Sequence, residues 1–432
     1  MNKRPERMAR THELVKAGLA RRRAAEVRFR VYGLISIVGG LCFLFTLFGS
    51  IVGHAGAAFQ QTFVALDVRF DTEILAPDGK WDQEARMAAD YGALLKQSLA
   101  AAFPGVRERQ QKRALSALLS NGAAFELRQM LEARPDLLGK SETVWVPAAS
   151  DADSYAKGQI DRSVDESERR LSDQQLAWLD KLAAEGRLQK RFNTTFFTAG
   201  DSREPELAGI RGAITGSMLT LLVTLLLSLP IGMATAVYLE EFAPRNRWTD
   251  IIEVNINNLA AVPSIVFGLL GLAVFINVFG LTRSSPLVGG FVLTLMTLPV
   301  IIIAGRSALK AVPPSIREAA LGIGASHMQT VFHHVLPLAV PGILTGAIIG
   351  MARALGESAP LLMIGMVAFI VDIPSGISEP ATVLPVQIYL WADSPERGFV
   401  ERTSAAILVL LVFLIVMNGT AVYLRKRFER RW

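Results

Sequence analysis

Long apolar stretches alternate with charged segments along the whole chain. A hydrocarbon core of about 30 Å requires roughly 20 apolar residues as a helix, and about six stretches meet this requirement. They lie near 31–53, 212–239, 256–280, 286–309, 340–370 and 404–424. The pattern predicts an all-α polytopic membrane protein. The first stretch follows a basic segment but has no clean small-x-small cleavage site, so we expect an uncleaved anchor.

The segment between the first two apolar stretches has a different pattern. Apolar residues occupy every second position of one run, the period of a half-buried strand: Val64, Leu66, Val68 and Phe70. Ser172 with Gln175 forms a capping-box pattern that opens an apolar helical stripe. A further alternation predicts a second strand through Phe192, Thr194, Phe196 and Thr198. Residues 56–209 are therefore expected to form a small mixed α and β domain.

Both ends of the chain are basic. The tails carry Lys3, Arg4, Arg7, Arg10, Lys16, Arg21, Arg22, Arg23, Arg28 and Arg30, and Arg425, Lys426, Arg427, Arg430 and Arg431. Because cytoplasmic flanks are enriched in Lys and Arg, we expect 1–30 and 425–432 to be cytoplasmic tails and the 56–209 domain to be extracytoplasmic. The formal net charge of +6 is then explained by these flanks, without a nucleic-acid partner.

Composition fits this mixture, since 51% of the residues are hydrophobic and 19% are charged. The lone Cys42 falls in the first apolar stretch, which excludes disulfides.

Two short motifs of the chain are weak candidates for ligand sites. Gly139-Lys140-Ser141 resembles the end of a phosphate-binding loop, but Arg134 stands where the first glycine of that loop is required. Adjacent His333 and His334 diverge on a helix and have no carboxylate at the fourth position onward, so we expect no metal site. Neither a cofactor nor enzymatic activity is predicted.

One predicted cytoplasmic loop, 306–339, has an ordered spacing of small and helix-breaking residues. These are Glu318, Ala319 and Ala320, then Gly324, then Leu336 and Pro337. The loop resembles the EAA loop of ABC-importer permeases, in which a short helix, a glycine turn and a second helix dock on an ATPase. Small residues permit close approach, Gly324 permits a sharp turn, and Pro337 is expected to stop the second helix. His334 departs from the aliphatic residue usual in that family.

Two charges lie within the fifth apolar stretch. Arg353 and Glu357 are four residues apart and so share one helical face. Each charge at bilayer depth costs about 2.5–3.5 kcal/mol on insertion scales, so the default interpretation is functional. An arginine fork suits an oxyanion, and the carboxylate could accept a hydrogen bond from a protonated phosphate. A structural ion pair between helices is the alternative. Pro360 is expected to kink this helix beside Glu357.

Further stretches resemble the PstA-type permease of the phosphate-specific ABC importer over about 210–424. They are 238–247, from Tyr238 to Arg247; 257–268, from Asn257 to Gly268; 353–362, from Arg353 to Leu362; and 384–389, from Leu384 to Tyr389. The resemblance implies a type I ABC-importer permease fold in a bacterial inner membrane, with an extended N-terminal domain seen in some members. It also implies a role for Arg353 in phosphate passage, whereas the role of Glu357 is less defined.

The resemblance further implies four kinds of partner. They are a second related permease, two copies of a cytoplasmic ATPase, an extracytoplasmic phosphate-binding protein and membrane lipid. The predicted organisation is a 1–30 tail, a 31–55 first transmembrane helix, the 56–209 insert, a 210–424 permease domain and the 425–432 tail. Another oxyanion such as sulfate, molybdate or phosphonate is an alternative substrate. A membrane-anchored ligand sensor is an alternative of another class.

Overall fold

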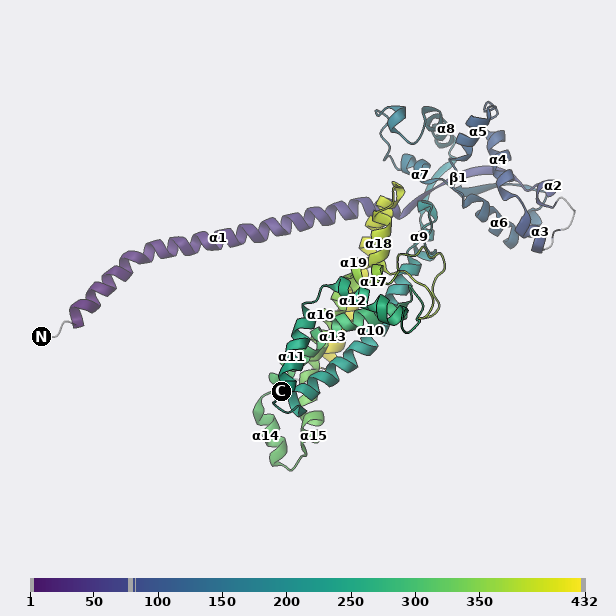
Figure 1. Ribbon diagram of the computed structural model, residues 1–432. Helices are drawn as coiled ribbons and strands as arrows, with labels where there is room; N and C mark the ends of the chain where they lie inside the picture. Colours follow the sequence, from purple (N-terminus) through teal and green to yellow (C-terminus); the bar gives the residue numbers. More distant parts are fainter. Residues whose placement is uncertain (1–3, 77–80, 82, 429–432) are drawn as a thin grey trace. The chain divides into compact units, whose positions relative to one another are not determined.

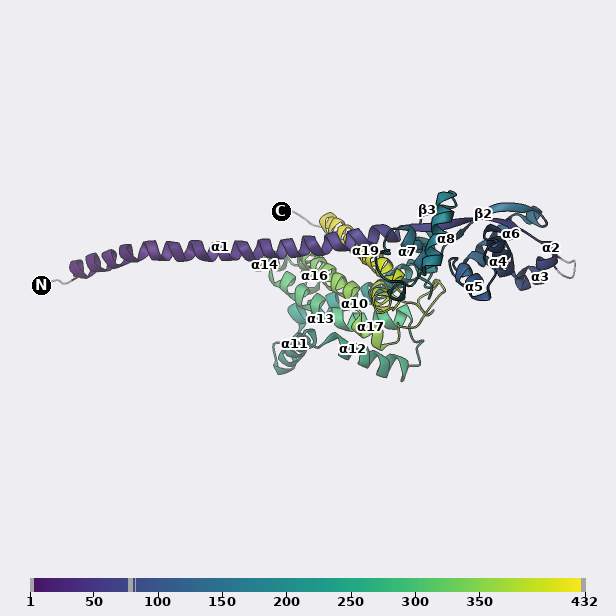
Figure 2. The same ribbon diagram turned by 90° about the horizontal axis from the view of Figure 1, so that it is seen from above.

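The computed structural model describes residues 4–76, 81 and 83–428, and Figures 1 and 2 show it in two views. The chain divides into two units, 1–53 and 54–432. The first unit consists of most of α1, Arg4–Ala58. Its part from Arg21 onward is long and apolar enough to cross a membrane. Side chains such as Phe43 and Phe45 are exposed in this part, as expected of a helix surrounded by lipid.

The predicted mixed domain is present at the start of the second unit. Its sheet has the order β2-β1-β3, with both pairs antiparallel. The strands are β1 Gln60–Arg69, β2 Ser141–Pro147 and β3 Leu188–Phe192. The helices are α2 Thr72–Leu75, α3 Gln83–Ala88, α4 Tyr91–Ala102, α5 Arg109–Ser116, α6 Ala123–Ala133, α7 Ser150–Ala156, α8 Asp173–Ala184 and α9 Thr194–Thr198. We refer to 56–209 as the insert.

Local patterns in the insert were mostly correct. The four alternating apolar residues of the prediction are fully buried in the core of the insert: Val64, Leu66 and Val68 of β1, and Phe70 directly after it. Ser172 and Gln175 form both hydrogen bonds of a capping box at the start of α8, which confirms that prediction. The prediction of a second strand from Phe192 to Thr198 was wrong. Asn193 accepts a hydrogen bond from the Phe196 N–H and begins α9 where the strand was expected to continue.

The remainder of the second unit is helical. Its elements are α10 Arg211–Val237, the π-helix η4 Tyr238–Phe242, α11 Arg247–Ala260, α12 Ser264–Gly271, the π-helix η5 Leu272–Ile276, α13 Pro286–Lys310, α14 Pro314–Gly322, α15 His327–Gln329, the π-helix η6 Thr330–Val335, α16 Leu336–Gly356, α17 Ala359–Met363, α18 Leu384–Ala392 and α19 Gly398–Phe428. Five described helices could cross a membrane, or six if one bent pair counts as a span.

That bent pair corrects the predicted span 256–280. The structure instead has α11 followed by a second helix, Ser264–Ile276, which consists of α12 and η5, with an angle of 101° between the two. The break lies at Pro263, which has no N–H to donate and disfavours a helical conformation in the residue before it. The predicted span therefore combined the end of one helix with the whole of the next.

Helices α10, α13 and α16 pack along one another and form the centre of the helical part of the second unit. Small residues permit this closeness. A Cβ added to Gly346 of α16 would lie 2.2 Å from the Cβ of Ala304 in α13. Any larger side chain at Gly346 would force the two helices apart, which makes this pair a close-packed membrane interface.

Candidate functional site: a coupling loop and an ion pair at a helix end

The loop with the Glu-Ala-Ala sequence forms a helix, a turn and a second helix. Helix α14 contains Glu318, Ala319 and Ala320 and ends at Gly322. Gly324 then adopts a φ of +94°, a conformation that only glycine adopts without strain. The next helix begins at His327, where Ser326 provides a second capping box. The structure thus brings the predicted turn and flanking helices into one hairpin.

The role predicted for Pro337 was wrong. The second helix of the hairpin does not stop there but continues from His327 to Gly356 without a break. Leu336 and Pro337 lie in the first turn of α16, directly after the π-helix η6. The Leu336 N–H donates to the carbonyl of Val331, five residues earlier. The wider π turn accommodates the proline, whose ring would otherwise clash with the preceding turn.

The outer end of the hairpin is available to a partner. Glu318 and Ala319 are exposed, whereas Ala320 is buried against the chain's own helices. Ile323, beside the turn, has 82% of its surface exposed. An apolar tip beside an unpaired carboxylate, which has no ion-pair partner among the described residues, is a surface suited to docking on another protein.

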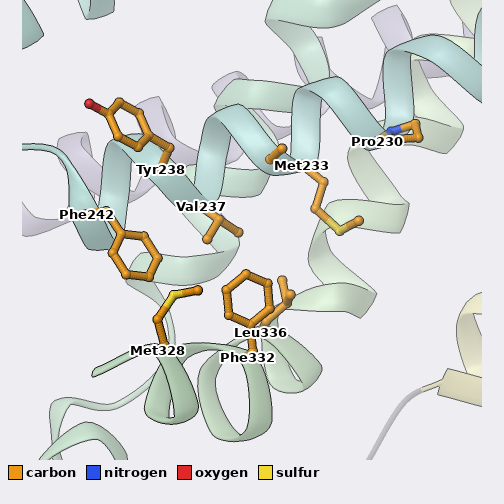
Figure 3. Close-up of a pocket in the computed structure, with 9 residues that line it drawn as sticks. Pro230, Met233, Val237, Tyr238, Phe242, Met328, Phe332 and Leu336 are labelled. Carbon is orange, nitrogen blue, oxygen red and sulfur yellow. The ribbon is translucent and has the colours of Figure 1, made fainter. Parts of the chain in front are cut away.

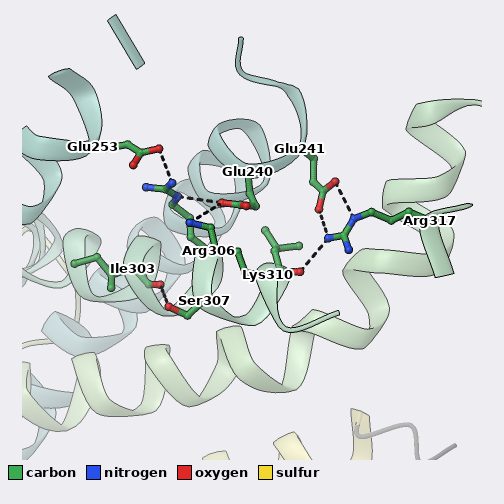
Figure 4. A network of polar contacts seen from close by, with 9 residues as sticks. Glu240, Glu241, Glu253, Ile303, Arg306, Ser307, Lys310 and Arg317 are labelled. Atoms are coloured by element: carbon green, nitrogen blue, oxygen red, sulfur yellow. Dashed lines mark hydrogen bonds and ion pairs between the residues drawn. The ribbon is translucent and has the colours of Figure 1, made fainter. Parts of the chain in front are cut away.

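An ion pair that the sequence analysis missed fixes α14 to the membrane helices. Arg317 Nη2 donates to Glu241 Oε1 at 2.6 Å, and the Glu241 side chain is only 6% exposed. The same guanidinium donates to the carbonyls of Val312 and Leu309. Figure 4 shows the arginine and the carboxylate facing each other. Since Glu241 belongs to η4, at the end of α10, the hairpin cannot move independently of that helix.

A second cluster lies beside this pair. Arg306 of α13 contacts Glu240 of η4 and Glu253 of α11 (Figure 4). Lys310 lies 3.6 Å from Glu240 but is largely exposed. Opposite charges therefore hold together the end of α13, the η4 segment that follows α10 and the middle of α11. The sequence feature that could have predicted these ion pairs is the adjacent Glu240 and Glu241, because two acidic residues directly after an apolar span require basic partners when they are buried.

An apolar pocket of about 370 Å³ separates the hairpin from the last turns of α10. Met328 and Phe332 of the hairpin point toward Met233 and Val237 of α10 (Figure 3). Phe242 contacts the ring of His327 edge to face at 5.1 Å. The lining of this pocket is almost wholly apolar, which makes it a poor site for an anion.

Arg353 and Glu357 meet as their spacing predicted. Arg353 Nε lies 3.7 Å from Glu357 Oε1, and the two side chains are 47% and 21% exposed. This distance is longer than a strong charge-assisted hydrogen bond, so the pair is loose. On the other side of the helix, Ala354 and Leu355 are buried in the core. The guanidinium is thus on the open side of α16, where its donors are accessible.

The helix around this pair differs from the prediction. Helix α16 ends at Gly356, so the predicted span 340–370 is too long, and Glu357 has an extended conformation with φ −81° and ψ 122°. Pro360 does not kink a continuous helix but lies in the first turn of the short helix α17. Pro360 disfavours a helical conformation just ahead of it and suits a helix start. The ion pair therefore marks the end of a membrane helix.

Two family models match the chain. One is described as "Binding-protein-dependent transport system inner membrane component" and matches residues 228–430. The other is described as "Domain of unknown function (DUF3333)" and matches residues 16–166. The first therefore contains the hairpin formed by α14, the turn at Gly324 and the helix from His327, and both members of the Arg353–Glu357 pair. The second contains most of α1 and most of the insert.

Similar curated proteins align over about half of the chain. A probable ABC transporter permease protein, YqgI of Bacillus subtilis, is 33% identical over 247 residues, which are 53% of this chain and 83% of that protein. The phosphate transport system permease protein PstA 1 of Mycobacterium tuberculosis is 32% identical over 223 residues, 52% of this chain and 72% of that protein. An inward-facing MetNI methionine ABC transporter overlaps 51% of this chain and 96% of its own at a TM-score of 0.42 and 20% identity, too weak a likeness to transfer any detail.

Proposed function

Since the chain belongs to the PstA-type permeases of binding-protein-dependent ABC importers, we propose that it forms half of the path by which phosphate crosses the membrane. It is a multi-pass inner-membrane protein and a non-catalytic subunit, so ATP is hydrolysed on another chain. The observation that supports phosphate as the substrate is the accessible Arg353 guanidinium, held loosely by Glu357 at the end of a membrane-length helix. A planar fork with two parallel donors matches two phosphate oxygens.

Glu357 gives the site its second property. With no substrate present it neutralises Arg353, which lowers the cost of holding a charge at the end of the span. When phosphate arrives, Arg353 gives up its loose contact with the Glu357 carboxylate and donates two hydrogen bonds to phosphate oxygens instead. The carboxylate is then free to accept a hydrogen bond from a protonated phosphate oxygen. Sulfate has no proton at neutral pH and would meet only repulsion at Glu357, which favours phosphate over sulfate.

The coupling hairpin transmits movement to this path. An ATPase that docks on Glu318, Ala319 and the turn at Gly324 would push or pull α14. Arg317 passes the displacement to Glu241 and so to α10, while the unbroken helix from the hairpin passes it along α16 toward Arg353. Leu336 and Pro337 lie within that connection. Alternating access follows when ATP closes the ATPases and hydrolysis releases them.

The proposed assembly contains a second related permease and two copies of a cytoplasmic ATPase. An extracytoplasmic phosphate-binding protein delivers the substrate. The second permease is needed because the open side of Arg353 requires a facing wall to exclude water and lipid. Both termini are cytoplasmic, the insert is extracytoplasmic, and the hairpin is cytoplasmic beside the ATPases. This arrangement follows the distribution of basic residues at the helix flanks.

The direct test is uptake of labelled phosphate in cells that lack this chain and then regain it. Uptake should be lost and then restored, and Arg353→Ala should not restore it although the protein inserts normally. Stimulation of ATP hydrolysis in the assembled complex by phosphate, sulfate, molybdate or phosphonate identifies the transported anion. Full uptake with Arg353→Ala would reject Arg353 as a phosphate ligand.

A further inference from the structure

The insert contains a basic pocket that the transport function does not use. Its volume is about 500 Å³, and it lies between α4 and α5. Its lining combines exposed cations with buried apolar residues: Lys96, Arg109, Lys112 and Arg113, with Leu99 and Leu115. The two leucines belong to the insert's hydrophobic core. A rigid apolar base therefore supports a rim of positive charge.

The charges of this rim are concentrated and unpaired. Arg109, Lys112 and Arg113 share one face of α5, where like charges three and four residues apart cost about 0.2–0.5 kcal/mol per pair. Lys96 faces them from α4. None of the four forms an ion pair within the described part of the chain, although Glu108 lies four residues before Lys112.

Several other cations of the insert are paired with a carboxylate. Arg128 pairs with Glu132 at 2.8 Å, and Arg187 pairs with Asp67 at 2.9 Å. Arg134 pairs with Glu142 in the same way. Against this background, the four exposed cations around one pocket form a local excess of positive charge, with no carboxylate among the residues that line it. A bound anion would neutralise this excess.

We propose that this pocket binds a phosphate group, either as free inorganic phosphate or at the head of an anionic lipid. A phosphate group carries about −1.5 to −2 charges at pH 7 and three acceptor oxygens, which matches two arginine forks and two ammonium groups. The volume is within the roughly 300–1,000 Å³ of small-ligand pockets and exceeds what inorganic phosphate fills. The buried leucines provide an apolar contact for an organic substituent. This site is separate from Arg353 and does not depend on which anion is transported.

The test uses the full chain in lipid nanodiscs and measures acylation of individual lysines by mass spectrometry. A bound phosphate should slow acylation of Lys96 and Lys112 about threefold at twice its dissociation constant, since the free fraction falls as 1/(1 + [L]/Kd). Lys140, an exposed lysine paired with Asp136, is the internal control. Inorganic phosphate is titrated into zwitterionic nanodiscs, and a separate sample contains anionic lipid without phosphate. Protection in the first sample identifies free phosphate, and protection in the second identifies a lipid headgroup.

Two substitutions test the arginines. Arg109→Gln and Arg113→Gln should each reduce the protection of Lys96 and Lys112, whereas Arg69→Gln on the exposed side of β1 should leave it unchanged. Equal protection of Lys140, or equal protection by sulfate at matched ionic strength, would indicate general screening and overturn the proposal. Protection that appears only when a binding protein is added would also overturn it, in favour of an acidic protein surface. Labelled phosphate uptake is measured in parallel. If Lys96 and Lys112 are not protected but uptake is normal, only the phosphate-binding pocket is rejected, and the proposed transport function stands.

Discussion

Arg317 of α14 and Glu241 of η4 are 76 positions apart in sequence but form a 2.6 Å charge-assisted hydrogen bond. The pair links α14, the first helix of the hairpin, to the end of α10. Because the carboxylate is almost fully buried, removal of either partner leaves the other without compensation. The contact therefore positions the hairpin, and in the proposed mechanism it is the link that would transmit hairpin movement to α10.

Arg317→Gln should abolish most phosphate uptake while the protein still inserts. The substitution leaves Glu241 without its cation, at a cost of about 1–3 kcal/mol for the lost charged hydrogen bond, and frees α14 from α10. ATP hydrolysis by the assembled complex should continue but lose its stimulation by substrate. Lys310→Gln is the matched control, since that lysine is mainly exposed and makes only a 3.6 Å contact. Uptake that falls equally in both variants would argue against a specific role for Arg317.

Gly324→Val should also uncouple transport. The φ of +94° at Gly324 costs a non-glycine residue about 1–2 kcal/mol, and a β-branched residue more. No neighbouring atom crowds this position, so the effect would come from the backbone alone. Gly324→Asn should retain more uptake, because asparagine tolerates the left-handed region better. Gly322→Val, in the last turn of α14, controls for the added side chain. Normal uptake with Gly324→Val would remove the turn from the mechanism.

Arg353→Lys should sharply reduce phosphate uptake at a normal protein level, because lysine retains the charge but not the planar fork. Exchange of the two charges, Arg353→Glu with Glu357→Arg, distinguishes a substrate site from a structural pair. If the pair is structural, the exchanged variant should recover much of the uptake lost in the single variants. If it is a substrate site, uptake should stay low. Recovery in the exchanged variant would therefore favour the structural interpretation.

Glu357→Gln should weaken discrimination against sulfate more than it weakens phosphate uptake. The amide keeps the size of the side chain but removes the negative charge that repels an unprotonated anion. Competition of unlabelled sulfate with labelled phosphate measures the change. If sulfate competes with phosphate uptake equally well in the variant and the unaltered protein, the Glu357 carboxylate does not distinguish a protonated anion from an unprotonated one.

Asp201→Asn should stabilise the purified chain at neutral pH. Burial raises the pKa of Asp201 above its ordinary value of 3.8, while its Oδ1 accepts a hydrogen bond from the Trp391 indole at 3.0 Å. A raised carboxyl pKa contributes stability at low pH that is lost as pH rises through the folded-state value. The advantage of asparagine should therefore grow from pH 4 toward neutrality, as measured by the thermal unfolding midpoint.

Asp201→Ala is the control for that prediction. It removes the buried charge but also removes the acceptor of the indole N–H, which costs about 1–3 kcal/mol. The alanine variant should therefore unfold at a lower temperature than the asparagine variant at every pH. If the asparagine variant gained nothing at neutral pH, Asp201 would not carry a destabilising charge in the folded protein.

Reporter fusions test the orientation. A reporter fused after Trp432 should be cytoplasmic, and one inserted within 100–180 should be extracytoplasmic, because the basic flanks predict that both termini lie inside. Enzymatic reporters active on opposite sides of the membrane give matched readouts. A cytoplasmic insert would overturn the orientation and the proposed position of the phosphate-binding pocket.

Local patterns determined much of this protein. The alternation through Val64 and Phe70 predicted a strand face, and Ser172 with Gln175 predicted a helix start, because neighbouring residues alone set these features. The spacing of Arg353 and Glu357 likewise predicted their contact, although Glu357 lies just past the last residue of the helix instead of on its face. Apolar length predicted the spans, except where Pro263 and Gly356 ended helices inside a continuous apolar run.

Tertiary structure decided what connects these elements. Nothing in the local sequence pairs Arg317 with Glu241 or Arg306 with Glu253, because each partner lies on a different helix and packing of whole helices brings them together. The same reason applies to Lys96, which reaches the cations of α5 only after α4 and α5 pack on a common core. The sequence by itself determined the elements and the charges they carry, whereas the three-dimensional packing determined which charges are compensated and which remain available to a ligand.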